Sequence, residues 1–198
     1  NIQTNQFEYS DINIIDNFDN INNWWQPSGS GSTIGVLAGT EFSTSNSFYL
    51  PGTSPQRSAK LSYVWDLGSA DHLLREYLSG GPPREVYFNS GFILQCYIYG
   101  DGSYNLFRFC VDDHVPDAAA AYHEVSEWFL IDWIGWKLIE WDLGTDPVGT
   151  WIGNGLLEGT LRIDSFQMTL GESGASEGAI YFDNFRVVIK NILSTDNE

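Results

Sequence analysis

The sequence predicts an all-β fold, an antiparallel β-sandwich with at most one or two short helices in its loops. Short runs of alternating apolar and polar residues recur along the chain, and Gly, Pro, Ser and Asn separate them. No long amphipathic helix interrupts the pattern, which is typical of a sandwich. Because sandwiches of 198 residues commonly form one unit, we expect one domain over residues 1–198, with its core at about 10–190.

The strands follow from alternation and flanking turn residues. The clearest predicted strands are Asn13–Phe18, Ser58–Asp66, Phe92–Tyr99, Tyr104–Val111, Trp136–Leu143, Leu161–Leu170 and Ala179–Ile189. Three weaker candidates are Thr33–Ala38, Glu85–Asn89 and Glu124–Ile131. Together they are enough for two packed sheets.

Two segments depart from this pattern. Ser69–Leu78 opens with a possible cap, repeats apolar residues at helical spacing and ends before Gly80, so it predicts a short helix over one end of the sandwich. The alanine-rich segment Pro116–Ala121 fits either a helical turn or a loop.

A strong turn signal, Asp101-Gly102, separates two apolar and aromatic runs at 92–99 and 104–111. Asp-Gly favours a two-residue hairpin loop, and that register pairs Cys96 with Phe107 and Ile93 with Cys110. The two sulfurs then lie on opposite faces of the sheet. Since these are the chain's only cysteines, we predict two free thiols.

The same register sorts the hairpin into two faces. One is apolar and belongs to the core. The other carries rings, an amide and a guanidinium, from Gln95, Tyr97, Tyr99, Tyr104 and Arg108. This mixture suits sugar recognition, because rings stack on C–H faces and forked polar groups bind hydroxyls. An ordinary solvated sheet face with cross-strand tyrosine pairs is the alternative.

Five of the eight tryptophans lie between Trp128 and Trp151. Indole rings bind sugars but also fill cores, so the cluster alone does not separate the two roles. Alternation assigns Trp141 to the core and leaves Trp136 and Trp151 as candidate ligand contacts. Elsewhere, the adjacent pair Trp24-Trp25 predicts one ring pointing inward and one outward if it lies in a strand.

The charge balance excludes two classes of partner. Nine Lys and Arg against 26 Asp and Glu give a net charge of −17, which repels nucleic-acid phosphates and anionic lipid surfaces. No apolar run approaches the roughly 20 residues that span a bilayer. We therefore expect no nucleic-acid binding and no membrane insertion. The carboxylates suit calcium, or simply solubility.

The opening IIDNFDNINNWW and the closing GAIYFDNFRVV resemble the first and last strands of carbohydrate-binding modules of the galactose-binding-like type. GWKLIEWDL and LRIDSFQM resemble the middle of such modules, although only the two ends are specific. The resemblance implies a jelly roll and a non-catalytic module that binds a polysaccharide or oligosaccharide. It also implies a secreted or cell-surface bacterial protein.

Many modules of this family carry a structural calcium where the two ends meet. The resemblance places its carboxylates at Asp16, Asp19 and Asp183. Here Asn17 stands where the family has a second Asp, and Asp19 replaces Glu, which weakens the site. Turn and cap chemistry of Asp and Asn is the alternative. The polar ends indicate linkers, so we expect a monomeric domain fused to others in a larger chain.

Two other classes of function stay open. A glycosidase needs a carboxylate pair, for which Glu127, Asp132, Glu140, Asp142 and Asp164 offer many combinations. A polysaccharide lyase would use His114, Tyr122 or His123 beside Arg108. No motif supports either, so no residue is assigned a catalytic role. A structural or interaction domain of a surface protein, without a glycan ligand, is the third class.

Overall fold

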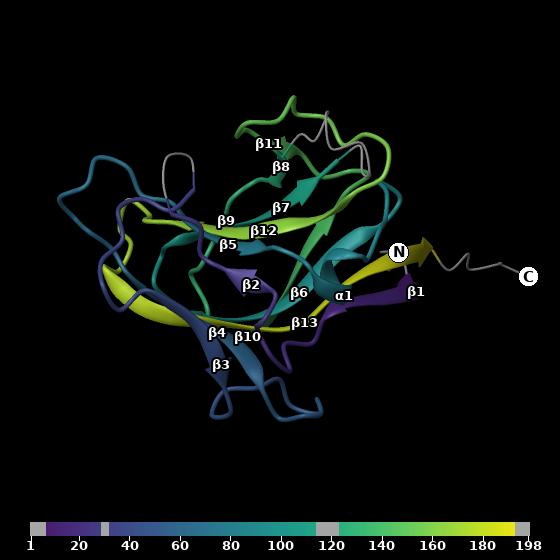
Figure 1. The fold of residues 1–198 in the computed structure, drawn as a ribbon. Helices are drawn as coiled ribbons and strands as arrows, with labels where there is room; N and C mark the ends of the chain where they lie inside the picture. The colour runs from purple at the N-terminus through teal and green to yellow at the C-terminus, as the bar shows by residue number, and fades with distance from the viewer. Residues whose placement is uncertain (1–6, 29–31, 114–122, 193–198) are drawn as a thin grey trace, which may run out of the picture.

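The computed structural model describes residues 7–28, 32–113 and 123–192, and these form two antiparallel sheets packed face to face (Figure 1). The jelly-roll β-sandwich is confirmed, with one short helix. The elements are β1 (Phe7–Asp16), β2 (Trp24–Trp25), β3 (Glu41–Ser45), β4 (Ser58–Val64), β5 (Leu74–Leu78), α1 (Gly81–Arg84), β6 (Ile93–Asp101), β7 (Leu106–Asp112), β8 (His123–Ser126), β9 (Phe129–Leu130), β10 (Ile134–Asp142), β11 (Val148–Gly149), β12 (Arg162–Thr169) and β13 (Glu177–Ile192).

The first sheet, called sheet A, has the order β10-β6-β13-β4-β3. Its centre is the long strand β13, which pairs with β6 on one side. On the other side, β13 pairs first with β4 and then with β1, so both ends of the described chain lie in this sheet. Asn184 adopts a φ of 49° at the irregularity between these two halves.

The second sheet, called sheet B, has the order β11-β8-β7-β12-β5-β2, and β9 also pairs with β7. In Figure 1 it forms the layer above sheet A. The two layers enclose one apolar core, rich in aromatic rings. At its centre Phe166 of β12 stacks on Phe182 of β13 with ring centres 4.6 Å apart, so the two sheets meet through their inward-facing rings.

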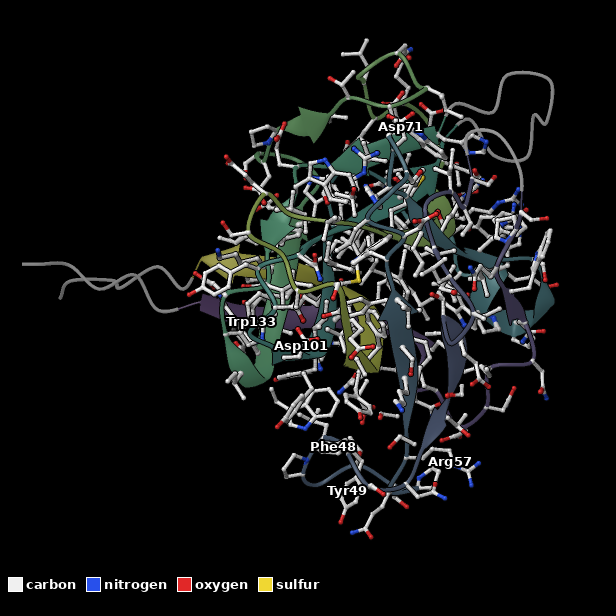
Figure 2. The ribbon with its side chains drawn as sticks, turned by 90° about the vertical axis from the view of Figure 1, so that its left-hand side faces the viewer. Phe48, Tyr49, Arg57, Asp71, Asp101 and Trp133 are labelled. Atoms are coloured by element: carbon white, nitrogen blue, oxygen red, sulfur yellow. The ribbon has the colours of Figure 1, made fainter. Side chains whose placement is uncertain are left out.

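The predicted hairpin between residues 92 and 111 is wrong. β6 lies in sheet A between β10 and β13, whereas β7 lies in sheet B between β8 and β12. The Asp101-Gly102 turn is a corner between sheets, because Gly102 N donates to Trp133 O and Tyr104 N donates to Ile131 O. Figure 2 shows Asp101 beside Trp133 at this corner.

The inward faces of both strands are nevertheless as predicted. Leu94, Cys96 and Ile98 of β6 face the core, as do Phe107 and Phe109 of β7. Since the strands belong to opposite layers, their outward faces are on opposite sides of the molecule.

The predicted helix at Ser69–Leu78 is also wrong. Leu74–Leu78 forms β5, in which Leu74, Glu76 and Leu78 are buried while Arg75 and Tyr77 face outward. Pairing with β12 and β2 outweighs the helical spacing of the leucines. The segment Pro116–Ala121 lies outside the described residues.

Both cysteines are free, as predicted, and both are buried. They are separated because Cys96 belongs to sheet A and Cys110 to sheet B, and not because of a hairpin register. Trp141 is buried in the core, again as predicted. The described part of the chain contains no helix that is long and apolar enough to cross a membrane.

Candidate functional site

The outer face of sheet B carries a hollow of about 250 Å³, lined by Trp25, Pro27, Arg75, Tyr77 and His123. The pairing of β2 with β5 creates one side of it, because it places Trp25 directly opposite Tyr77. The adjacent indoles diverge as expected: Trp24 is 6% exposed in the core, and Trp25 is 50% exposed. The rings of Trp25 and Tyr77 meet edge to face, with centres 6.1 Å apart.

Arg75 occupies the middle of this face. Its guanidinium lies 5.1 Å from the ring centre of Tyr77 and 5.1 Å from that of Trp151. Its Nη2 donates to Asp164 Oδ2 at 2.5 Å, and its Nε donates to Ser165 Oγ at 3.1 Å. The guanidinium is therefore fixed in plane by β12, and it holds two aromatic rings at set positions.

Asp112, near the end of β7, collects a second set of polar contacts. Its Oδ2 accepts hydrogen bonds from Arg84 and Arg162, each at 3.0 Å, and its Oδ1 lies 2.7 Å from His123 Nδ1. Burial raises the pKa of Asp112, but the bonds from His123 and Arg162 outweigh it and lower the pKa overall. The hydrogen bond to Asp112 raises the pKa of His123.

Arg108, expected as a ligand contact, is 5% exposed. Its Nε donates to Gln167 Oε1, its Nη1 donates to Thr150 O, and its guanidinium lies 4.0 Å from the ring centre of Trp128. Burial lowers its pKa to about 10. Arg108 is thus a structural part of the sheet B face and not an open donor.

Cations are concentrated on this face of an acidic chain. Four of the six arginines lie here, namely Arg75, Arg84, Arg108 and Arg162. Aromatic surfaces and charged forks therefore lie together, a combination that suits hydroxyl-rich ligands with apolar C–H faces.

The outer face of sheet A holds other residues expected as ligand contacts. Gln95 is fully buried. Its Nε2 donates to Glu140 Oε1, and its Oε1 accepts from Arg186 Nε. Arg186 also lies over the ring of Tyr97, at 5.7 Å. Gln95 is therefore closed to a ligand by its own hydrogen-bond partners.

An aromatic cluster continues this face of sheet A. The ring of Tyr99 meets those of Phe48, Trp136 and Tyr181 at 5.1, 5.6 and 5.8 Å. Phe48 comes from the loop between β3 and β4, where Figure 2 also shows Tyr49. Tyr104 is half exposed and lies at the corner between the sheets.

The seven expected contacts therefore do not form one surface. Gln95, Tyr97, Tyr99 and Trp136 belong to sheet A, and Arg108 and Trp151 belong to the sheet B face. Trp25, Arg75 and Tyr77 of the hollow were not expected. The Trp24-Trp25 pair was a signal for Trp25, but Tyr77 was hidden by the predicted helix.

The carboxylates considered for catalysis are also dispersed. Glu140 is hydrogen-bonded to Gln95 and Tyr9 on sheet A, and Asp164 is paired with Arg75 on sheet B. His123 lies at the hollow, while His114 and Tyr122 lie outside the described residues.

One side-chain group could hold a metal ion. The ligand atoms of Asp112, His123 and Asp164 all lie within 4.8 Å of one another. Arg75 already pairs with Asp164, and Arg84 and Arg162 pair with Asp112, so the group also forms an ion-pair network. Asp164 Oδ1 is buried without a hydrogen-bond partner among the described residues.

The three carboxylates expected to bind calcium are not brought together as closely as this group. In the part of the chain that the structure describes, Asp16, Asp19 and Asp183 do not form a group of that closeness. Asp16 accepts from Phe18 N at 2.7 Å and from the Trp24 indole at 2.8 Å. By contrast, Asp183 Oδ1 and Asn184 Oδ1 are buried without a hydrogen-bond donor in suitable geometry. Such oxygens are suitable ligands for a hard cation such as calcium.

Solved structures of several carbohydrate-binding modules share this fold. A family 11 carbohydrate-binding module from Clostridium thermocellum, in complex with a β-1,3-1,4-mixed-linked tetrasaccharide, matches 90% of this chain and 95% of its own length, at 19% identity and a TM-score of 0.54. A family 11 module of a cellulosomal cellulase of the same organism matches 93% and 97%, at 15% identity and a TM-score of 0.53.

A third structure, of carbohydrate-binding modules from the β-sandwich superfamily, matches 87% of this chain and 60% of its own length, at 14% identity and a TM-score of 0.52. At these identities the likeness shows the fold. No protein-family model matches the sequence, and no curated protein matches it significantly.

Proposed function

We propose that this chain is a non-catalytic polysaccharide-binding module that holds its ligand on the outer face of sheet B. The observation that carries the proposal is the hollow between Trp25, Arg75 and Tyr77, where an exposed indole and a partly exposed phenol ring border a fixed guanidinium. Trp151 extends this surface on the far side of Arg75. The family 11 modules with the same fold support a glycan ligand.

The rings and the polar groups have separate tasks. Trp25 and Tyr77 offer apolar faces that stack on the C–H surfaces of sugar rings. Sugar hydroxyls then hydrogen-bond to the arginine guanidinium groups of this face. The ion pairs with Asp112 and Asp164 fix the direction of these groups. Because Arg75 cannot rotate without breaking its ion pair, little side-chain entropy is lost on binding.

Titration of the wild-type protein against soluble polysaccharides tests this function. Tryptophan fluorescence and affinity electrophoresis with mixed-linkage β-glucan, xylan, mannan and alginate should show saturable binding to at least one of them. Lack of any response across the panel would contradict the proposal and favour a structural domain without a glycan ligand. Assays for reducing sugars and unsaturated products on the same panel should stay negative, since a positive result would indicate an enzyme.

We further propose a structural calcium ion at the junction of the two ends of the sandwich. Asp183 Oδ1 and Asn184 Oδ1 are buried without a donor in suitable geometry, while Asp183 Oδ2 accepts from Leu50 N at 3.1 Å. Asp19 is near enough to Asp183 to raise its pKa, after the larger effect of burial. Asp16 has a smaller share, because both of its oxygens accept internal hydrogen bonds. Bound calcium would supply charge neutralisation and hold the loop after β1 against β13.

The comparison with solved structures also bears on the larger protein to which this chain belongs. A module of a cellulosomal cellulase shares this fold over most of both chains. We infer a monomeric module fused to other domains in a secreted or cell-surface bacterial protein. Sedimentation of the isolated chain at one-chain mass would support the monomer, and dimerisation would contradict it.

A further inference from the structure

Trp151 does not belong to a strand, although it borders the proposed ligand surface. It follows β11 in the loop along the edge of sheet B (Figure 1). Its ring lies 5.1 Å from the Arg75 guanidinium and 5.7 Å from the His123 ring. A loop residue can serve as a rigid ring platform only if its backbone is held in place.

One charged side chain holds the loop after Trp151. Glu124 of β8 is 1% exposed, and its Oε1 accepts from Asn154 N at 2.6 Å while its Oε2 accepts from Gly155 N at 3.0 Å. Both oxygens of one buried carboxylate therefore bind consecutive backbone N–H groups, which are strong, charge-assisted bonds.

The glycines of the loop fit this carboxylate. A side chain at Gly153 would collide with the Glu124 carboxylate, and Gly155 has a φ of +81°, which favours glycine. The Gly153-Asn154-Gly155 sequence thus lets the backbone wrap closely around Glu124. The proposed sugar contacts of Trp25, Arg75 and Tyr77 do not themselves require a buried glutamate in β8.

A second charged side chain holds the loop before Trp151. Arg108 Nη1 donates to Thr150 O at 3.1 Å, and Gln167 and the Trp128 ring fix the guanidinium from two other directions. An anion and a cation, both buried, therefore bind the backbone on either side of Trp151.

We propose that Glu124 and Arg108 are positioning residues for ligand binding: they hold the loop so that Trp151 forms part of the glycan surface, without touching the glycan themselves. This rests on the proposed function. It assigns a role to Glu124 that its sequence does not reveal, and it gives Arg108 a supporting role instead of a contact.

A double-mutant cycle tests the proposal in the intact chain. Trp151→Ala and Glu124→Ala should each weaken binding of the polysaccharide in the panel that the wild type binds by about tenfold, and the double variant should be no weaker than either. Glu172→Ala, at an exposed turn residue, is the matched control and should bind like wild type. Additive losses, or wild-type affinity in Glu124→Ala, would overturn the proposal.

A second readout does not depend on a ligand. In the NMR spectrum, the Trp151 indole N–H signal, assigned by its loss in Trp151→Phe, should shift or broaden in Glu124→Gln, whereas that of core Trp141 stays sharp. Gln keeps the shape of Glu, so the fold should survive. It offers one acceptor oxygen instead of two, so one of the two bonds to the loop backbone is lost. An unchanged Trp151 signal would contradict the positioning role, while a shifted signal with no glycan bound by the wild type would sink only the proposed function.

Discussion

The guanidinium of Arg75 lies 5.1 Å from the ring centre of Trp151, and the same side chain forms a buried ion pair with Asp164. A strand residue, a loop indole and a buried carboxylate are thereby joined at one point of sheet B. The rigidity of the proposed ligand surface depends on this arrangement, because the arginine fixes the rings that flank it.

Removing this arginine should destabilise the protein. In Arg75→Met the fully buried Asp164 carboxylate loses its arginine partner and keeps only His123 Nδ1, at 3.5 Å, so we expect the free energy of unfolding to fall by about 3 kcal/mol. Urea denaturation followed by tryptophan fluorescence measures the change. The double variant Arg75→Met/Asp164→Asn should recover part of the loss, and no recovery would contradict the ion-pair explanation.

A buried glutamate should make stability depend on pH. Glu76 faces the core opposite Phe166, neither of its oxygens has a hydrogen-bond donor, and burial raises its pKa to about 8 from 4.5. Between these values the folded chain holds a proton that the unfolded chain releases. Stability should therefore fall as pH rises from about 5 to 8, by about 1.4 kcal/mol per pH unit from this group.

The variant Glu76→Gln isolates that effect, because it keeps the shape and cannot ionise. Its melting temperature should depend less on pH than that of the wild type, and above pH 7 it should be the more stable protein. Some slope should remain, since burial also raises the pKa of Glu124. Equal dependence of the melting temperature on pH in the two proteins would show that Glu76 does not stay protonated in the folded chain.

The thiols offer a check on the packing of the two sheets. Cys96 and Cys110 are fully buried, and burial raises the pKa of both thiols. An aromatic disulfide reagent should detect two thiols per chain in denaturant and react very slowly with the native protein. Fewer than two thiols in the unfolded, unreduced chain would contradict the assignment of free cysteines.

Removal of calcium should lower stability if the proposed site is filled. Chelation with EDTA should lower the melting temperature, and added calcium should restore it. Asp183→Asn should remove most of this response, whereas Asp142→Asn, on the outer face of β10, should keep it. A melting temperature that ignores EDTA would count against the ion.

The inward faces of the strands could be predicted because alternation is a local property of the chain. Leu94, Cys96 and Ile98 show it, and Trp141 follows the same rule. The partner of a strand is not local. The Asp101-Gly102 signal describes a turn, but Trp133 and Ile131, from further along the chain, bind that turn and send β7 into the other sheet.

The proposed ligand surface was harder to predict for the same reason. Tyr77 is outward-facing only because Leu74–Leu78 is a strand, and β2 and β12, from distant parts of the chain, make it one. Trp25 could be anticipated as one of two adjacent indoles that diverge. Its meeting with Tyr77 could not, since no sequence pattern records which edge strand joins β5.

The most direct test compares two aromatic variants on opposite faces of the sandwich. Trp25→Ala removes the exposed indole of the sheet B hollow, and Trp136→Ala removes the indole beside Tyr99 on sheet A. Calorimetric titration with mixed-linkage β-1,3-1,4-glucan, or with the polysaccharide of the panel that binds the wild type, should show at least a tenfold loss of affinity for Trp25→Ala and wild-type affinity for Trp136→Ala. Loss in Trp136→Ala with full affinity in Trp25→Ala would contradict the account and place the ligand on sheet A.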